Sequence, residues 1–424
     1  MNEFLLKFIT VFKDQTLRKR LIFTILALVG FRLLATIPIP SVDPASLAKL
    51  LSSSQFFGFL NIFSGGGLSN LSIVMLGVGP FITSSIIIQL LTMILPKWKA
   101  LMHDEGEAGR LKLSQYSRWI APPLAVVQAI GFLMLLQSQN VLPHLGFFPM
   151  AVNVIVVSAG SMLLMWIGEL ISEFGIGNGV SLIIFSGIVS RLPSDINQFI
   201  ASYDSANLPV YIAALAVGLI VVAGVVFITE AERSVPVTYA KQVRGNKVYG
   251  GASTYIPLRL NQAGVIPIIF ALSILLFPQI ISNFLAGLTS HPIIAEYARS
   301  FTIFFNNQWV YGSAYFILVV LFTYFYTAVT FDPAMISENL QRSGAFIPGV
   351  RPGEHTRDHI GNIVTRITLV GALFLGIIAI LPLAMQAFTA NKSLAIGGTA
   401  LLIVVSVILD LLKKIDAQVS MREY

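Results

Sequence analysis

Long apolar stretches, separated by shorter polar segments, run through most of the chain. A helix needs about 20 mostly apolar residues to cross the hydrocarbon core of a bilayer. Ten stretches reach or approach this length, at about residues 21–37, 73–95, 119–137, 152–171, 180–192, 210–229, 264–284, 310–331, 367–388 and 394–412. The pattern predicts an all-α polytopic membrane protein with ten transmembrane helices.

Two segments interrupt this pattern. Residues 55–70 are apolar but too short to span, and they contain the triplet Gly65-Gly66-Gly67. The short fifth stretch follows Gly-Ile-Gly-Asn-Gly at residues 175–179. Irregular backbone at membrane depth survives only where it is buried in protein or lines a watery cavity. We therefore expect 55–70 to form a re-entrant half-helix, with an interfacial helix on the outer leaflet as the alternative. Two breaks in one half point to a pore or a midplane site.

The charged residues support this topology. They make up 11% of the chain, whereas soluble proteins carry about 25%, so a soluble enzyme is excluded. Most of the 27 Lys and Arg residues fall on one side of the ten predicted spans. Because cytosolic loops retain Lys and Arg, we expect residues 1–20 to be a cytosolic N-terminal segment and residues 413–424 a cytosolic C-terminal tail. Arg32 is an exception, since it lies within the first span.

Two long loops on the basic side, about residues 230–260 and 332–365, mix charged, glycine, proline and aromatic residues. Ordinary retention of positive charge explains many of these basic residues. Retention of positive charge does not, however, require loops as long as these two. The loops therefore favour docking surfaces for a large anionic partner in the cytosol.

Enzyme chemistry finds little support. The chain has no cysteine, its five histidines all lie in predicted loops, and it has no Walker-type phosphate loop. His355 and His359 are spaced to share one metal ion on a helix, but no third ligand is evident. We expect no catalytic residues, no metal and no cofactor.

The second, seventh and tenth spans are rich in isoleucine, valine and leucine, and few ionisable residues lie within any span. An aliphatic constriction can gate a pore by dewetting, although contact with lipid explains any single isoleucine equally well. A secondary transporter built from inverted repeats is the alternative. Such proteins usually place ionisable side chains along their pathway, so the scarcity of these residues argues against it.

Several blocks of the sequence resemble the SecY family of bacterial protein-conducting channel subunits. One is Asn-Ile-Phe-Ser-Gly-Gly-Gly-Leu-Ser at residues 61–69. The other blocks lie at residues 77–90, 175–185, 239–241, 248–251, 261–267, 346–354 and 397–405. The blocks are spread over nearly the whole chain, and their order agrees with the ten-span topology.

The resemblance implies two pseudo-symmetric five-helix halves around an hourglass pore, at residues 21–192 and 210–412, joined by an external connection at 193–209. It implies a plug at about residues 57–70, including Phe63, Ser64, Gly65, Gly66, Gly67 and Leu68. The implied pore ring is Val78, Ile82, Val180, Ile184, Ile269 and Ile403. A lateral gate would include Thr83, Gln128 and Asn261, for which a routine interhelical hydrogen bond worth about 0.6 kcal/mol is the alternative.

The resemblance also implies a function and partners. The chain would pass unfolded polypeptides across the bacterial cytoplasmic membrane, with both termini in the cytosol, and release apolar segments sideways into membrane lipids. Expected partners are SecE-like and SecG-like small membrane subunits, the SecA motor ATPase, the ribosome, and signal sequences. Docking of the motor or ribosome would involve Arg351, with Arg244 and Lys247 as further candidates for phosphate contacts.

Overall fold

The computed structural model describes residues 13–39, 61, 64–98, 101, 106–138, 141–143, 146–201, 208–239, 242–244, 247–249, 253–262, 264, 266–286, 292–389 and 392–420. Within this part of the chain, each predicted span coincides with a helix. These helices are α2 (Gln15–Thr36), α5 (Gly79–Ile94), α7 (Gly106–Ser138), α8 (Phe147–Phe174), α9 (Gly179–Val189), α11 (Leu208–Glu230), α12 (Ile266–Ala286), α14 (Gln308–Thr330), α16 (Glu354–Thr389) and α17 (Lys392–Ser420). The all-α polytopic membrane fold is confirmed.

The helices differ in length from the apolar stretches that predicted them. α7 and α16 begin 13 residues before their apolar stretches and so extend beyond any hydrocarbon core. α5 begins at Gly79, later than predicted, because the chain makes turns up to residue 78. Among the described residues, four segments are long and apolar enough to cross a membrane by themselves, and α5 and α9 are among the shorter apolar helices.

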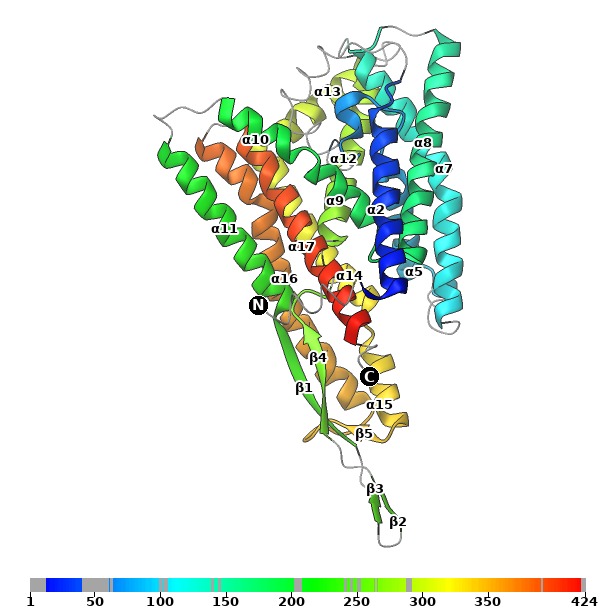
Figure 1. Ribbon diagram of the computed structural model, residues 1–424, viewed down its shortest axis with the longest axis vertical. Coiled ribbons are helices and arrows are strands. Elements are labelled where there is room, and N and C mark those ends of the chain that lie inside the picture. The colour runs from blue at the N-terminus through cyan, green and yellow to red at the C-terminus, as the bar shows by residue number, and fades with distance from the viewer. Residues whose placement is uncertain are drawn as a thin grey trace.

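The helices form two groups that meet along a shared core. In one group α5 packs against α7, α7 against α8, and α8 against α9 and α2. In the other, α14 packs against α12 and α16, and α17 packs against α16 and α11. The groups contact each other where α12 lies against α5 and α7, and where α17 lies against α9 (Figure 1). One apolar cluster of buried side chains runs through both groups.

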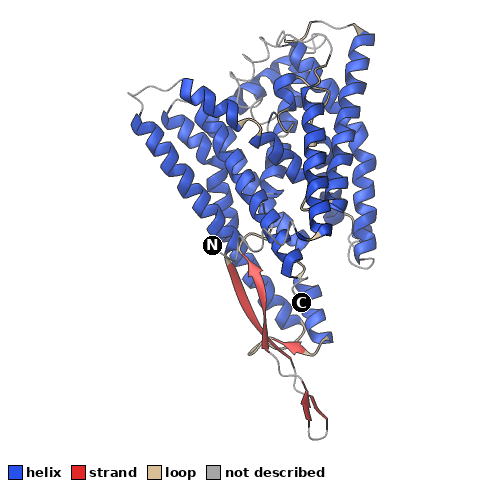
Figure 2. Ribbon diagram, in the orientation of Figure 1, coloured by secondary structure: helices blue, strands red, loops and turns tan. Residues whose placement is uncertain are grey.

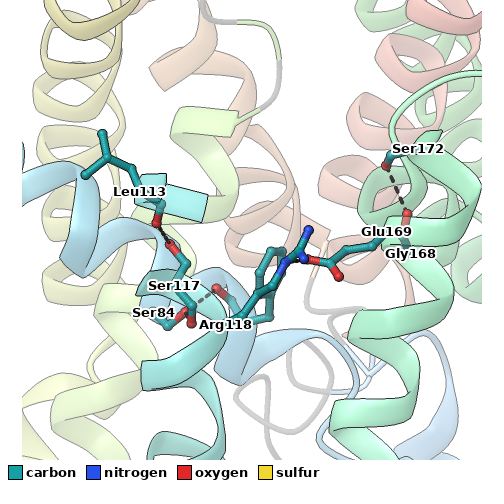
Figure 3. A network of polar contacts seen from close by, with 8 residues as sticks. Ser84, Leu113, Ser117, Arg118, Gly168, Glu169 and Ser172 are labelled. Carbon is teal, nitrogen blue, oxygen red and sulfur yellow. Dashed lines mark hydrogen bonds and ion pairs between the residues drawn. The ribbon is translucent and has the colours of Figure 1, made fainter. Parts of the chain in front are cut away.

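Polar contacts connect the helices of the first group. The Ser84 hydroxyl on α5 donates to the carbonyl oxygen of Ser117 on α7 at 2.7 Å. Arg118 on α7 forms an ion pair with Glu169 on α8 (Figure 3). One turn further along α8, the Ser172 hydroxyl accepts the N–H of Gly179, the first residue of α9, at 2.9 Å. These contacts join four helices into a unit.

The junction between α8 and α9 shows why α9 is short. Gly177 has a φ of +98°, which turns the chain back into the bundle. The Asn178 side chain then caps α9 by accepting the N–H of Ser181 at 3.2 Å. A Cβ on Gly179 would overlap the carbonyl oxygen of Gly168, so α8 and α9 touch backbone to backbone. The glycines that interrupt the apolar pattern therefore place α9 inside the bundle.

The two basic loops fold into a structured extension at one end of the bundle, opposite α10 (Leu192–Ala201) and α13 (Pro292–Asn306) (Figure 1). β1 (Glu232–Tyr239) pairs antiparallel with β4 (Ser253–Arg259), and β5 (Ala345–Phe346) adds to the other edge of β1. β2 (Gln242–Arg244) and β3 (Lys247–Tyr249) form a separate hairpin. The strands lie together at this end, as Figure 2 shows.

A second apolar cluster holds this extension to the bundle. Val235 and Val237 from β1 and Leu258 from β4 are buried in one cluster with Ile360 and Val364 from the first turns of α16. The helix α15 (Pro333–Arg342) begins after Asp332, whose carboxylate accepts the N–H of Ala334 at 2.8 Å. The described parts of the two long loops thus form strands and a helix that pack against α16.

Candidate pore, plug and gate

The six predicted ring residues come from four helices of the bundle. Val78 and Ile82 lie at the start of α5, Val180 and Ile184 on α9, Ile269 on α12 and Ile403 on α17. Five of them are at most 6% exposed, and Val180 is partly buried. All six belong to, or pack against, the apolar cluster that both helix groups share. Aliphatic side chains from both groups therefore lie in one buried apolar core.

The described part of the predicted plug is a tight loop beside this core. We call residues 64–70 the plug loop; Phe63 and residues 57–60 lie outside the described part of the chain. Gly65 and Gly66 have φ values of +63° and +83°, which glycine adopts without strain. A one-turn 3₁₀ helix, η1 (Gly67–Asn70), follows. Ser64 and Leu68 are each 1% exposed, so residues 64–68 of the plug loop are buried in protein, whereas Asn70 is exposed.

Hydrogen bonds close the plug loop onto the end of α2. The Ser64 hydroxyl accepts the N–H of Leu68 at 3.0 Å, which fixes the loop internally. The N–H of Ile39 donates to the carbonyl oxygen of Leu71 at 2.9 Å, and the N–H of Ile73 donates to that of Ile37 at the same distance. The loop is therefore anchored at its C-terminal end, next to α5.

Arg32 on α2 contacts the plug loop at its other end. Its Nη1 donates to the carbonyl oxygen of Gly65 at 3.0 Å, and its Nη2 donates to those of Ser186 and Gly187 on α9 at 2.7 and 3.2 Å. The sequence identified Arg32 as an intramembrane charge without assigning it a role. The only signal for this role in the sequence was an arginine inside the first predicted span, which is followed along the chain by the glycine triplet.

Two of the three predicted gate residues are brought together. The Gln128 amide on α7 donates to the hydroxyl of Thr83 on α5 at 3.4 Å, and that hydroxyl donates to the carbonyl oxygen of Gly79 at 3.0 Å. Asn261, which precedes α12, instead donates to the carbonyl oxygen of Gly264 at 3.2 Å. Asn261 is 6% exposed, and its buried Oδ1 has no hydrogen-bond partner within the part of the chain that the structure describes.

The SecY family model matches residues 72–412 of the chain. The protein translocase subunit SecY of Corynebacterium glutamicum is 40% identical over 98% of both chains. The protein of the same name from Mycobacterium tuberculosis is 38% identical, again over 98% of both chains. The chain belongs to the SecY family.

Solved structures show the same fold as this SecY-family chain. A protein-conducting channel aligns with a TM-score of 0.65 at 20% identity, covering 96% of this chain and 93% of that one. Sec61 in a canine ribosome–channel complex from the endoplasmic reticulum aligns with a TM-score of 0.63 at 18% identity, with the same coverage. Membership of the SecY family makes this chain a multi-pass membrane protein and not an enzyme.

The predicted docking residues lie on the structured extension of this SecY-family chain. Arg351 is exposed in the turn between β5 and α16, where its carbonyl oxygen accepts the hydroxyl of Thr356 at 2.8 Å. Arg244 and Lys247 lie opposite each other in the antiparallel backbone register of β2 and β3. The structure thus places all three on elements that project from the bundle (Figure 1).

Proposed function

We propose that this chain is the pore-forming subunit of a protein translocase in the bacterial cytoplasmic membrane. It passes unfolded polypeptides outward and releases apolar segments sideways into the lipid. The observation that carries this proposal is that Ile82, Ile184 and Ile403, from both helix groups, are buried in one apolar cluster that also includes Leu68 of the plug loop. Membership of the SecY family supports the same function.

In the resting state, the ring of Val78, Ile82, Val180, Ile184, Ile269 and Ile403 would exclude water and ions, because a narrow aliphatic passage dewets. The buried plug loop adds a second layer to this seal. Neither layer presents a fixed charge to a passing chain, so polypeptides of any sequence meet the same aliphatic surface. That property suits a channel for unfolded proteins.

The lateral gate would open where α12 leaves α5 and α7. Among the described residues, Thr83 and Gln128 bond within one helix group, and Asn261 bonds within its own turn. The contact of α12 with α5 and α7 therefore depends on packing more than on these three polar groups. An apolar signal sequence would replace such packing at little cost, since lipid and leucine are similarly apolar.

The structured extension would receive the cytosolic partner. Arg351, Arg244 and Lys247 would contact an anionic surface there, such as ribosomal RNA phosphates or acidic groups of a SecA-type motor. SecE-like and SecG-like subunits would complete the membrane complex. On this orientation both termini are cytosolic, in agreement with the position of the basic segments.

The function is tested by reconstitution. The chain is incorporated into proteoliposomes with its small membrane subunits, and a SecA-type motor, ATP and a precursor protein are added. We expect ATP-dependent protection of the precursor from added protease, and no protection of a precursor that lacks its signal sequence. Absence of protection, together with uptake of a small solute driven by an ion gradient, would instead establish the transporter alternative.

A further inference from the structure

We propose that Arg32 is a positioning residue that latches the plug loop to the C-terminal end of α9 and so keeps the resting channel closed. This inference rests on the proposed channel function. Arg32 lies on α2, a helix that contributes none of the six ring residues, yet its guanidinium joins two other elements of the bundle. We call the set of Arg32, Gly65 and Gly187 the latch.

The bonds of Arg32 are directed at backbone carbonyls. One guanidinium nitrogen bonds to the plug loop at Gly65, and the other bonds to α9 at Ser186 and Gly187. Hydrogen bonds from a charged donor are roughly twice as strong as neutral ones. The Arg32 side chain is partly buried, and within the described part of the chain its buried Nε has no hydrogen-bond partner.

The end of α9 is a favourable site for a cation. α9 ends at Val189, so Ser186 and Gly187 lie in its last turn, where the helix dipole is negative. Ser190 also donates two hydrogen bonds at this helix end. Its N–H donates to the carbonyl oxygen of Ser186 at 3.1 Å, and its hydroxyl donates to that of Gly187 at 2.9 Å. Arg32 thus adds a charged donor to both carbonyl oxygens at this helix end while it also bonds to the plug loop.

Two glycines bring the plug loop close enough for this contact. A Cβ on Gly187 would overlap the Cα of Gly65, so α9 and the plug loop touch backbone to backbone. A Cβ on Gly65 would lie 2.6 Å from Cζ of Phe31 and 3.3 Å from the carbonyl oxygen of Ile183. Any side chain at either position would therefore separate the loop from α9 and weaken the bond to Arg32.

The latch has a clear consequence for opening. Displacement of the plug loop breaks the bond from Arg32 to Gly65, whereas the two bonds from Arg32 to α9 can remain. Arg32 would then stay anchored on α9, ready to recapture the loop when the channel empties. Removal of the guanidinium should shift the population toward the displaced loop.

The test uses the full chain in its membrane complex. Arg32→Met removes the donors, Arg32→Lys keeps the charge but not the forked geometry, and Arg191→Met removes a cation just beyond α9. Within the described residues, the Arg191 side chain has no hydrogen bond to the plug loop, so this variant is the matched control. Since the chain has no cysteine, Ser64→Cys adds a single thiol to each background as a reporter.

Two quantities are measured: the resting ion conductance in planar bilayers, and the rate at which a water-soluble maleimide alkylates the Ser64→Cys thiol. Ser64 is 1% exposed, so alkylation should be slow while the latch is intact. We expect Arg32→Met to raise both quantities at least about tenfold, the factor that loss of one charged hydrogen bond produces. Arg32→Lys should give an intermediate increase, and Arg191→Met should leave both at the wild-type value.

Gly187→Ala provides an independent variant, because it moves the plug loop while Arg32 is still present. It should raise conductance and alkylation in the same direction, and it decides the matter if Arg32→Met does not reach the membrane. Wild-type conductance and alkylation in both variants would overturn the latch. Protease protection of a precursor by the wild-type complex is measured in parallel, so failure of the channel function is recognised separately from failure of the latch.

Discussion

Replacement of Asn261 by leucine tests the closed state of the proposed lateral gate. Asn261 precedes α12, the helix that contacts α5 and α7. In the structure its side chain is 6% exposed, its amide donates to the carbonyl oxygen of Gly264, and among the described residues its Oδ1 has no hydrogen-bond partner. When α12 moves away, that oxygen meets water or the incoming chain. Asparagine therefore destabilises the closed state relative to the open one.

The size of this effect follows from two opposing contributions. A buried acceptor without a partner costs about 1–3 kcal/mol, and the single bond that the amide donates contributes about 0.5–1.5 kcal/mol. Leucine removes both, so Asn261→Leu should stabilise the closed gate by about 1 kcal/mol. A change of that size lowers the open population about fivefold.

The assay is the initial rate of motor-driven translocation for two precursors that differ only in the hydrophobicity of their signal sequence. We expect the rate for the weakly apolar signal to fall about fivefold, the factor set by 1 kcal/mol. A strongly apolar signal should be affected less, because its own insertion drives the gate open. Asn362→Leu, at an exposed position on α16, is the control. An unchanged or faster rate with the weak signal would refute this account of the gate.

Two further predictions concern docking and packing. Arg351→Glu should abolish motor-driven translocation but leave insertion of the chain into membranes intact. Arg342→Glu, on the exposed face of α15, is the control and should leave translocation intact. Normal translocation by the Arg351→Glu variant would contradict the docking role of Arg351. Gly160→Ala should destabilise the protein by about 1–3 kcal/mol in thermal unfolding, because the added Cβ would overlap the carbonyl oxygen of Ile73. Gly218→Ala, where nothing lies within 4 Å, should be neutral or stabilising, and equal effects at both sites would refute the packing argument.

The helices of the bundle were predictable because a bilayer imposes a length and a polarity on each span. Even the short helix α9 was visible in the sequence, since Gly177 and Gly179 interrupt the apolar pattern at its start. Their function as a turn and as a backbone contact with α8 follows from glycine chemistry. The aliphatic character of the core was visible in the same way.

The extension and the latch were not predictable. β1 buries only alternate residues such as Val235 and Val237, and this short signal is hidden among charges in a loop that the sequence assigned to docking. The partners of Arg32 are carbonyl oxygens at Gly65, Ser186 and Gly187, and backbone acceptors leave no trace in side-chain identity. Contacts of this kind become visible only when the elements are placed in space.

The central claim is that aliphatic side chains of the ring seal the resting channel. It is tested by the triple substitution of Ile82, Ile184 and Ile403 by glycine. Ile155, Ile212 and Ile317 are at least 60% exposed on the outside of the bundle, so their triple substitution by glycine is the matched control.

The decisive measurement is the resting ion conductance of the purified complex in planar bilayers, without motor, ribosome or precursor. Because a wider and less apolar passage admits water, we predict that the ring variant conducts ions at rest. The wild type and the variant with three outward-facing isoleucines replaced should stay closed. Equal conductance in the ring variant and the wild type would contradict the account.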